Sequence, residues 1–405
     1  MNQNTEDHVV VGYTEKPHGE RPTGGKFLGY DHLHFWVGNA KQAAGWYTSR
    51  FGFEYYAYKG LETGSREVAT HVVRNKQGVT LAFSTPYGND KDNQKEMNQH
   101  QSLHGDGVKD VAFAVEDCNA IYNKAISRGA KCAYPPQELK DEHGSVTIAA
   151  VHTYGEVIHT FIQRNDYKGF FMPGFIAHPL KDPLNQVLPD IAYNYVDHIV
   201  GNQPDNMMTS AADWYEKTLD FHRFWSVDDS MIHTEFSSLR SIVMTDYDQK
   251  IKMPINEPAD GKRKSQIQEY IDFYAGPGVQ HIALNTSDVI NTVEGLRARG
   301  VEFLSIPTSY YDNLRKALSA QTSITVKEDL DVLQKNHILV DYDEKGYLLQ
   351  IFTKPVEDRP TLFYEIIQRN NHQGFGAGNF KSLFVSLELE QAKRGNLTEI
   401  VKNIY

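Results

Sequence analysis

The sequence predicts an α+β fold in which one module is built twice and followed by a C-terminal helix. Three observations carry this prediction: an internal repeat, short stretches in which apolar and polar residues alternate, and helical periodicity between those stretches. We expect each module to contain two βαβββ units, whose strands form a curved mixed sheet with helices outside and a cavity inside.

The internal repeat consists of three pairs of segments that occur in the same order in each half. The pairs are 27–35 with 195–200, 105–113 with 276–284, and 161–170 with 366–375. The first pair contains His32 and His198, and each of these histidines precedes a helical stretch that contains a Trp-Tyr pair. Three matches at similar spacing are hard to obtain by chance, so we interpret the chain as two copies of one module.

The repeat and the segments between its copies divide the chain into five parts. A polar start, a Pro-containing stretch and a final apolar stripe at helical spacing mark their boundaries. A helical insertion is expected in the second half around 310–333. The parts are a flexible N-terminal arm at 1–26, a first module without metal at 27–176, a linker at 177–190, a second, catalytic and metal-binding module at 191–378, and a C-terminal lid helix and tail at 379–405.

Composition narrows the class of protein. A net charge of −11, from 52 acidic and 41 basic side chains, argues against a nucleic-acid partner. No stretch approaches the roughly 20 apolar residues of a membrane span, so no membrane partner is expected. Only two cysteines, Cys118 and Cys132, occur in 405 residues, which is typical of a reduced compartment. These features predict a cytoplasmic protein.

Three residues of the second half form a candidate metal site. His198 and His281 each lie within a predicted strand, and Glu365 lies in the otherwise apolar strand 361–367. A carboxylate is costly to bury unless it is paired or bound to a cation. Two imidazoles and one carboxylate form the facial set that holds iron(II) and leaves three coordination positions open. Because the histidines open matching units, we expect their strands to face each other across the cavity.

The first half provides an internal control for this prediction. The positions equivalent to the three candidate ligands are His32, Asp110 and Thr160, so two of the three ligand types are absent there. We therefore expect one metal ion per chain and a structural role for His32. The sequence His104-Gly-Asp106 imitates an element of another class of iron oxygenase, but its place in a glycine-rich turn makes it a weaker alternative.

Beyond the N-terminal arm, the chain resembles the 4-hydroxyphenylpyruvate dioxygenases, a family of the vicinal oxygen chelate (glyoxalase/bleomycin-resistance-like) superfamily, in its animal or protist type. The segments that carry the resemblance are 196–202, 221–226, 252–258, 265–270, 278–283, 346–355 and 374–384. The resemblance implies one Fe(2+) per chain, bound by His198, His281 and Glu365. It also implies a site with polar residues Gln280, Gln350, Asn256, Ser241 and Gln266, and substrate-binding residues Phe352, Phe363, Phe375, Asn379 and Phe380.

The resemblance further implies the reaction. Members of the family convert 4-hydroxyphenylpyruvate and O2 to homogentisate and CO2, through oxidative decarboxylation, ring hydroxylation and side-chain migration, in the catabolism of tyrosine and phenylalanine. The expected partners are therefore a 2-oxo acid and O2, and a homodimer or homotetramer is implied. Phenylalanines suit the aromatic ring, and a few amides suit the polar oxygens of such a substrate. Without the resemblance, these phenylalanines would be read as ordinary core.

Three alternatives stay open at this point. A hydroxymandelate synthase-like enzyme would use the same metal and substrate but hydroxylate the benzylic carbon. A catechol-cleaving enzyme would share the ligand set and release no CO2. A non-catalytic small-molecule binding module of the same fold would need no intact set of ligands, so the presence of all three in this sequence counts against it. The stripe of Phe380, Leu383, Phe384 and Leu387 is interpreted as either plain core or a lid over the cavity.

Overall fold

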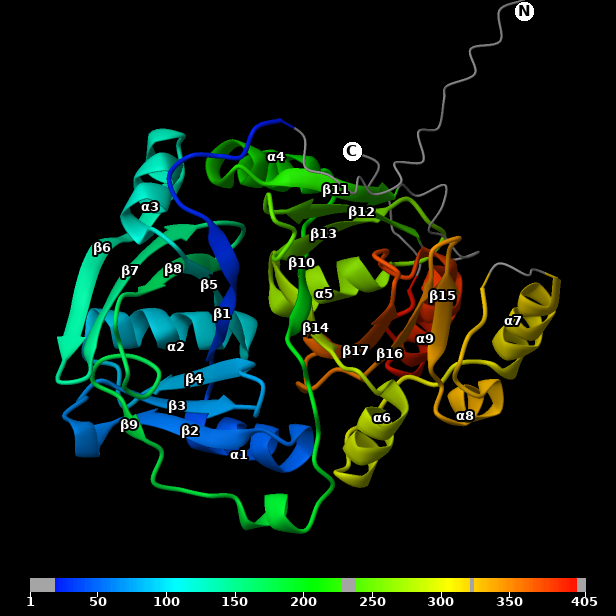
Figure 1. The fold of residues 1–405 in the computed structure, drawn as a ribbon, viewed down its shortest axis with the longest axis horizontal. Coiled ribbons are helices and arrows are strands. Elements are labelled where there is room, and N and C mark those ends of the chain that lie inside the picture. Colours follow the sequence, from blue (N-terminus) through cyan, green and yellow to red (C-terminus); the bar gives the residue numbers. More distant parts are fainter. Residues whose placement is uncertain (1–18, 228–237, 321–323, 399–405) are drawn as a thin grey trace, which may run out of the picture.

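A computed structural model of the chain describes residues 19–227, 238–320 and 324–398, with the side chains of residues 380 and 381 excepted. Most of the expected N-terminal arm, the end of the C-terminal tail and the side chain of Phe380 therefore lie outside the described residues. Two curved mixed sheets lie side by side, the first built by the N-terminal half and the second by the C-terminal half (Figure 1).

The first sheet has the strand order β6-β7-β8-β5-β1-β4-β3-β2-β9. Its two βαβββ units meet at the antiparallel pair of β1 and β5, with α2 as the connection between the units. The elements are β1 (Phe27–Trp36), α1 (Ala40–Phe51), β2 (Glu54–Lys59), β3 (Val68–Arg74), β4 (Thr80–Pro86), α2 (Asp92–His104), β5 (Gly107–Val115), α3 (Cys118–Ser127), β6 (Lys131–Asp141), β7 (Gly144–His152), β8 (Ile158–Arg164) and β9 (Ile176–Ala177).

The second sheet repeats the plan in the order β11-β12-β13-β10-β14-β17-β16-β15. Here α5 connects the units, and the expected insertion forms α7 and α8. The elements are β10 (Val196–Asn202), α4 (Met208–Leu219), β11 (His222–Val227), β12 (Ser238–Thr245), β13 (Lys252–Ala259), α5 (Gln266–Tyr274), β14 (Gly278–Asn285), α6 (Val289–Ala298), α7 (Thr308–Ala320), α8 (Leu330–Lys335), β15 (Leu339–Tyr342), β16 (Tyr347–Phe352), β17 (Phe363–Asn370) and α9 (Phe380–Lys393).

This architecture confirms the predicted α+β fold of four βαβββ units and a C-terminal helix, and it corrects one expectation. The strands of His198 and His281, β10 and β14, do not face each other across the cavity but are hydrogen-bonded neighbours. Each is the first strand of its unit, and antiparallel pairing of these two strands joins the two units into one sheet. The histidines therefore approach each other from adjacent strands.

Local sequence sets the ends of several helices. Helix α5 begins after Ser265, whose side chain accepts a hydrogen bond from the backbone N–H of Gln268, and α6 begins after Asp288, which caps Asn291 in the same way. At the end of α1, Gly52 adopts a φ of 73°, a left-handed conformation that favours glycine. These caps fix where α5 starts, and its first residue, Gln266, belongs to the predicted site.

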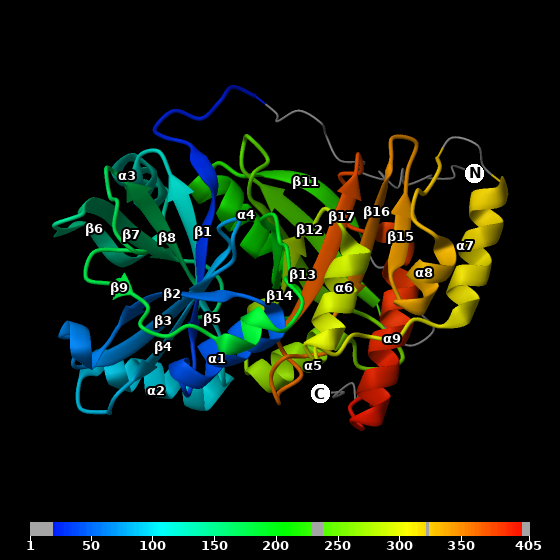
Figure 2. The same ribbon diagram turned by 60° about the horizontal axis from the view of Figure 1, so that its bottom comes forward.

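The two halves share one continuous core. The phenol of Tyr364 on β17 donates a hydrogen bond of 3.0 Å to Tyr47 on α1, and its ring lies 4.6 Å from that of Phe51. Tyr193, three residues after the linker, is fully buried and donates to the carbonyl of Phe51. Figure 2 shows α1 beside the second sheet, with the linker passing next to it. The first module therefore packs directly against the module that carries the candidate metal site.

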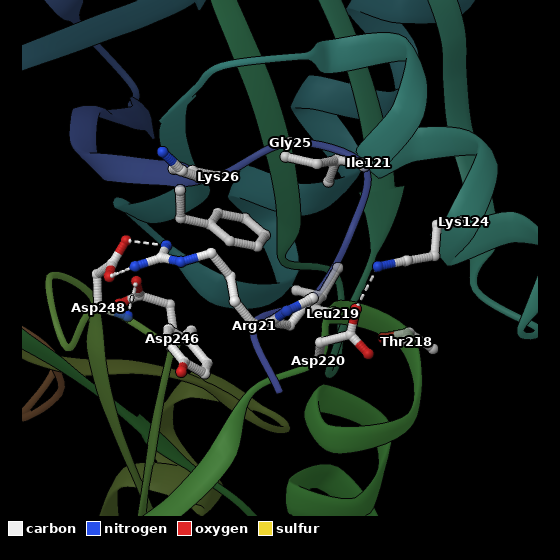
Figure 3. A pocket seen from close by; sticks show the side chains of 14 residues that line it. Arg21, Gly25, Lys26, Ile121, Lys124, Thr218, Leu219, Asp220, Asp246 and Asp248 are labelled. Carbon is white, nitrogen blue, oxygen red and sulfur yellow. Dashed lines mark hydrogen bonds and ion pairs between the residues drawn. The ribbon is translucent and has the colours of Figure 1, made fainter. Parts of the chain in front are cut away.

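The described part of the N-terminal segment also bridges the halves. Arg21 forms two hydrogen bonds of 2.7 and 2.6 Å with Asp248, in the turn between β12 and β13. Nearby, Lys124 of α3 pairs with Asp220 at 2.6 Å, at the end of α4 (Figure 3). None of the predicted site residues lines the pocket formed at this contact. No helix among the described residues is long and apolar enough to cross a membrane.

Candidate metal centre and substrate cavity

The three predicted metal ligands converge on one point inside the second sheet. Oε2 of Glu365 lies 3.1 Å from Nε2 of His198 and 3.4 Å from Nε2 of His281, and the side chains of His198, His281 and Glu365 are only 4%, 11% and 3% exposed. Donor atoms that share one metal ion at about 2.1 Å lie roughly 3–3.5 Å apart. Two imidazole nitrogens and a carboxylate at this spacing fit a divalent transition metal, and their three-sided arrangement leaves positions for further ligands.

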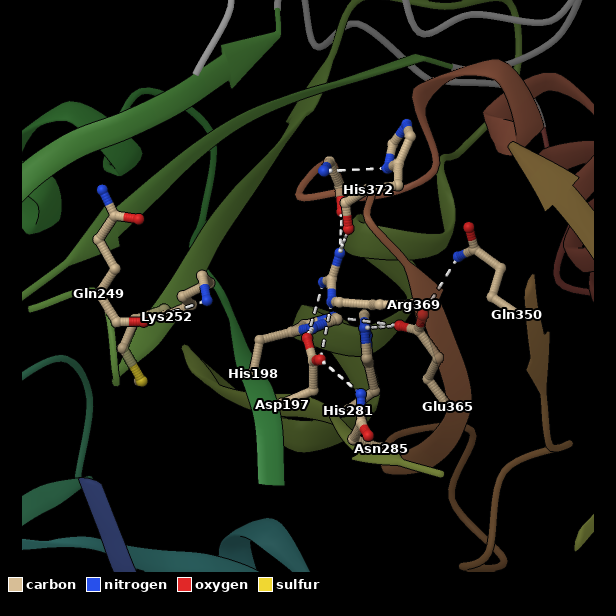
Figure 4. Close-up of polar contacts among 12 residues, drawn as sticks. Asp197, His198, Gln249, Lys252, His281, Asn285, Gln350, Glu365, Arg369 and His372 are labelled. Carbon is tan, nitrogen blue, oxygen red and sulfur yellow. Dashed lines mark hydrogen bonds and ion pairs between the residues drawn. The ribbon is translucent and has the colours of Figure 1, made fainter. Parts of the chain in front are cut away.

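A buried ion pair stands behind His198. Asp197 accepts from Nδ1 of His198 at 2.8 Å, and Arg369 donates to both oxygens of Asp197 at 2.8 and 2.7 Å (Figure 4). The arginine also donates to the backbone carbonyl of Gly374 at 2.6 Å. Because the Nδ1 proton is held by Asp197, the lone pair of Nε2 points at the metal position.

A break in strand pairing explains how Asp197 reaches His198. Neighbouring residues of a strand normally point to opposite faces. In the pairing of β10 with β14, Val196 is opposite Leu284 and His198 is opposite Ala283, so Asp197 is an extra residue without an opposite partner. Such a bulge re-aims side chains, and it places the acid and the imidazole on the same side.

Amide side chains continue the hydrogen-bond network around the other two ligands. Gln280 accepts from Nδ1 of His281 at 3.0 Å and donates to Gln266, at the start of α5, at 3.1 Å. Gln350 of β16 donates to the second oxygen of Glu365 at 3.2 Å and accepts from Asn379 at 3.2 Å. Both ligands are therefore held in orientation by predicted site residues.

The loop before α9 depends on a glycine. Gly376 has a φ of 79°, and a Cβ built on it would lie 1.8 Å from Oε1 of Gln350. Asn379, at the end of this loop, accepts a hydrogen bond of 2.8 Å from the phenol of Tyr310 on α7. The helical insertion therefore supports the loop that holds Gln350, and any larger residue at position 376 would displace that amide.

The charges at the centre favour a cation. Burial would raise the pKa of Glu365, but His198 and His281 lower that pKa to about 2. Burial would lower the pKa of His198, but the carboxylates of Glu365 and Asp197 raise it above its usual value. For His281 burial has the larger effect, and the pKa is lowered. Despite its burial, the pKa of Asp197 is well below its usual range because of Arg369 and His198. A divalent metal ion would replace the proton that these carboxylates attract.

A cavity opens next to the three ligands and encloses about 540 Å³ of empty space, including space open to solvent. Almost all residues predicted for the site line it. Ser241 and Asn256 lie opposite each other on β12 and β13. Asn379 does not line the cavity and instead supports Gln350 from behind. The predicted residues that line the cavity are Ser241, Asn256, Gln266, Gln280, Gln350, Phe352, Phe363 and Phe375, together with the three candidate ligands.

Aromatic rings surround the metal position. Phe363 stacks on the imidazole of His281 with ring centres 4.8 Å apart, and Phe352 meets the same imidazole edge-on at 6.0 Å. Phe375 lies edge-on to His198 at 5.1 Å. These contacts hold the imidazoles in place, and the outer faces of the rings give the cavity an apolar wall that suits an aromatic ligand.

Some functional residues were not identified from the sequence. Asp197 and Arg369 were missed because alternation places Asp197 on the opposite face from His198. A signal did exist, since both halves contain an Asp-His pair, Asp31-His32 and Asp197-His198, and both contain an arginine in the third repeated segment. Trp225 of β11 also lines the cavity, 5.8 Å from the ring of Phe375, and no pattern in the sequence distinguished it from core.

The first-half residues that were considered as alternative metal ligands make other contacts. Thr160 donates a hydrogen bond of 2.5 Å to Asp110, so these two residues, at the positions of Glu365 and His281, satisfy each other. In the motif His104-Gly-Asp106, the aspartate accepts from the backbone N–H of Gly38 at 2.8 Å. The histidine turns instead to a different carboxylate, Glu156, at 3.4 Å.

Comparisons with known proteins agree with this geometry. The family model of the Glyoxalase/Bleomycin resistance protein/Dioxygenase superfamily matches residues 29–156 and 195–351, one match in each half. The chain is 96% identical over 405 residues, all of both chains, to a 4-hydroxyphenylpyruvate dioxygenase of Tetrahymena thermophila. It is 59% identical over 381 residues to one of Caenorhabditis elegans, covering 94% of this chain and 96% of the relative.

Further similarity comes from a fish relative and a solved structure. A 4-hydroxyphenylpyruvate dioxygenase of Danio rerio is 58% identical over 392 residues, with 96% of each chain covered. A solved mutant of 4-hydroxymandelate synthase from Streptomyces coelicolor superposes with a TM-score of 0.76 at 27% identity, covering 90% of this chain and 99% of that one. Identity to each of these dioxygenases is therefore at least twice the identity to the synthase.

Proposed function

The chain belongs to the 4-hydroxyphenylpyruvate dioxygenases of the glyoxalase/bleomycin resistance protein/dioxygenase superfamily, and from this premise we propose that it acts through one iron(II) ion bound by His198, His281 and Glu365. The reaction converts 4-hydroxyphenylpyruvate and O2 to homogentisate and CO2. The observation that carries the iron proposal is the convergence of two imidazole nitrogens and one carboxylate oxygen at the cavity. When bound there, iron(II) supplies coordination positions for the 2-oxo acid and the redox chemistry of O2.

We assign the polar side chains of the cavity to the polar ends of the substrate. Gln280 and Gln350 contact the candidate ligands, so their amides lie next to the place where the oxygens of the 2-oxo acid would bind. Ser241, Asn256 and Gln266 line the same cavity and can bind the phenol. An amide or a hydroxyl can donate or accept a hydrogen bond, which suits a substrate with both a carboxylate and a phenol.

We assign the apolar side chains to holding the aromatic ring and excluding water. Phe352, Phe363 and Phe375 form the wall beside the ligands, and Leu383 and Phe384 of α9 also line the cavity. Exclusion of water strengthens the polar contacts to the substrate and protects reactive species from side reactions. Helix α9 is thus proposed to act as a lid; Leu387, the next residue of its apolar stripe, lines a separate pocket instead.

We also propose a role in tyrosine and phenylalanine catabolism in the cytoplasm, and an assembly of two or four copies of the chain. The substrate is the 2-oxo acid that corresponds to tyrosine, and this relation supports the first proposal. The two cysteines, Cys118 and Cys132, form no disulfide, which agrees with a reduced compartment.

The experiment that tests this function measures O2 uptake by the purified chain with 4-hydroxyphenylpyruvate, iron(II) and ascorbate. We expect one CO2 and one homogentisate for each O2 consumed. Homogentisate and 4-hydroxymandelate have the same elemental composition, so the product is identified by NMR of the ring protons. A para-disubstituted ring with four protons and a benzylic hydroxyl would favour the synthase alternative, whereas homogentisate has three ring protons. Binding of the acid without O2 uptake would favour the binding module. O2 uptake with a catechol but not with 4-hydroxyphenylpyruvate, and without release of CO2, would favour a catechol-cleaving enzyme.

A further inference from the structure

A second cluster of potential metal ligands lies in the first half, outside the site described above. His100 and His104 are one turn apart on α2, and Glu156 lies in the turn between β7 and β8. Oε2 of Glu156 is 3.4 Å from Nε2 of His104 and 3.9 Å from Nε2 of His100, and all three donor atoms lie within 4.8 Å of one another. These separations are close to those at the candidate iron centre, 3.1 and 3.4 Å.

Helix geometry brings the two imidazoles together. Residues four apart in an α-helix project from the same face, an arrangement that zinc proteins use for paired histidines. The helix buries this face, so that His100 and His104 are only 2% and 3% exposed. The ring of His100 also packs edge-on against Trp36 of β1, with centres 5.2 Å apart. Both rings are therefore held in place before any ligand binds.

The orientation of His104 presents a lone pair to the cluster. Its Nδ1 lies 2.5 Å from the backbone carbonyl of Tyr274, which can only accept, so Nδ1 is the donor. In the neutral ring, Nε2 then carries the lone pair, and this atom faces Glu156. Metal-bound histidines are usually oriented by such a contact through the other ring nitrogen. The centre at His198 has the same design, with Asp197 in the place of the carbonyl.

Buried polar atoms without partners are an independent sign of a missing ligand. Among the described residues, Nε2 of His104 and Nδ1 of His100 are buried and have no hydrogen-bond partner. A buried polar atom that is left unpaired destabilises the folded state. A metal ion would satisfy Nε2 of His104. The nearby cation Lys109 does not occupy the cluster, because it lies over the ring of Trp36 and 3.6 Å from Glu96.

We propose that His100, His104 and Glu156 bind a Zn²⁺ ion that clamps the two halves of the chain together. Two imidazoles and one carboxylate suit zinc, and the half-exposed side chain of Glu156 provides a path from solvent and room for a water ligand. The site is one of fixed geometry in the first half, and it does not depend on the iron site proposed above.

The clamp would act on the contact between halves. Nδ1 of His104 donates a hydrogen bond to the carbonyl of Tyr274, the last residue of α5. The turn that contains Glu156 lies against Pro277, just before β14. The other end of α5 carries Gln266, which contacts Gln280 in the substrate cavity. A bound ion would therefore fix α2, the β7–β8 turn and α5 relative to one another, and we expect it to raise the melting temperature of the protein.

Zinc binding to metal-free full-length protein tests the proposal, with metal counted by mass spectrometry after desalting and by calorimetric titration. Zinc also fits the iron centre, so the wild type should bind two equivalents. The variants Glu156→Gln and His104→Ala should each bind one, and His281→Ala should bind one. His143→Ala removes an exposed histidine that lies 3.8 Å from Glu142 but has no second imidazole, and it should still bind two.

The double variant His281→Ala/Glu156→Gln should bind no zinc, and zinc should raise the melting temperature of His281→Ala but not of the double variant. If the wild type binds a single equivalent that Glu156→Gln retains, or if Glu156→Gln still binds two with unchanged affinity, the proposal is wrong. Because Glu156 lies in a partly exposed turn, its substitution tests the site even if the buried His104→Ala variant fails to fold. Loss of zinc in Glu156→Gln with unchanged iron content would separate this site from the catalytic one.

Discussion

The surroundings of His32 in the first half and of His198 in the second are built alike, but only the second leads to a complete metal site. His32 contacts Asp31 at 2.8 Å, and Arg164 holds that aspartate at 3.0 and 2.8 Å. The pair of Asp197 and Arg369 stands behind His198 in the same way. In both halves the aspartate is the bulged residue of the first strand.

The aromatic neighbours also correspond. The ring of Phe171 lies edge-on to the imidazole of His32, with ring centres 4.8 Å apart. The guanidinium of Arg164 lies over the same phenyl ring at 5.9 Å. In the second half, the ring of Phe375 lies edge-on to His198 at 5.1 Å, and the guanidinium of Arg369 lies over this ring at 5.5 Å. The support of the first ligand is thus present twice in the chain, whereas the other two ligands are present once.

The interiors of the two sheets differ in the same sense. In the first half, Phe171 and Met172 join residues of the sheet in a buried apolar cluster. In the second half, the corresponding space is the cavity that Phe375 and Phe384 border. We infer that an imidazole with its supporting ion pair can persist as structure, while metal binding requires the two further ligands and an interior that is left open.

The largest expected effect comes from removing a ligand in one half and its counterpart in the other. We expect His198→Ala or Glu365→Ala to lose iron on desalting and to lose turnover, because two ligands hold iron(II) poorly. His32→Ala should keep iron and turnover and lower the free energy of unfolding by about 1–3 kcal/mol. Iron analysis and denaturant unfolding measure both. If His32→Ala lost iron while His198→Ala retained it, the iron centre would lie in the first half, and its assignment to the second half would be wrong.

The supporting aspartates sharpen the comparison. Asp197→Asn should weaken metal binding by about 10–100-fold, because it removes the acceptor that orients His198. The matched change Asp31→Asn should leave metal affinity unchanged and affect only stability. Competition with a chelator of known affinity gives both values. Equal metal affinities in the two variants would show that the ion pair has the same purely structural role in each half.

The amides next to the ligands are specific to the second half. We expect Gln280→Leu and Gln350→Leu to reduce kcat/KM by about 10–100-fold, which corresponds to about 1.5–3 kcal/mol for a hydrogen bond to a charged group. Gln163→Leu, which removes an amide from β8 of the first half, should leave kcat/KM unchanged. Steady-state kinetics at confirmed iron content measure kcat/KM. An unchanged kcat/KM in both Gln280→Leu and Gln350→Leu would show that these amides do not bind the substrate.

The proposed lid, α9, lies over the second sheet. Phe384→Ala should lower the ratio of product formed to O2 consumed by about twofold or more, because water then reaches the cavity. Leu389→Ala changes an exposed residue of the same helix and should leave that ratio unchanged. Parallel measurement of O2 and homogentisate in folded protein gives the ratio. Full coupling in Phe384→Ala would reduce α9 to ordinary packing.

The smallest effect concerns the junction of the halves. Burial and the nearby Asp106 raise the pKa of Glu357 to about 8. A carboxyl whose pKa is raised in the folded state destabilises that state increasingly as pH rises from about 4.5 to 8. Glu357→Gln should therefore raise the free energy of unfolding by about 1–2 kcal/mol at pH 8 and leave it unchanged at pH 4. Thermal melting across this range measures the difference, and a gain that is equal at both pH values would contradict the assignment.

The sequence by itself determined the fold class, because the internal repeat can be recognised from the pattern of residues without any knowledge of how the strands and helices pack. It also indicated the three metal ligands, since a carboxylate in an apolar strand and histidines at matched positions are costly to bury without a cation. The resemblance to a known family supplied the lining of the cavity, which apolar periodicity alone would have assigned to core.

Only the tertiary structure decided how these residues meet. Alternation predicts opposite faces for Asp197 and His198, and the bulge that joins them arises from the pairing of β10 with β14, two strands nearly 80 residues apart. The cluster of His104 and Glu156 was also hidden, because its carboxylate comes from a turn some 50 residues away. Local sequence sets local conformation, but strand register and the packing of the halves fix which distant side chains share a site.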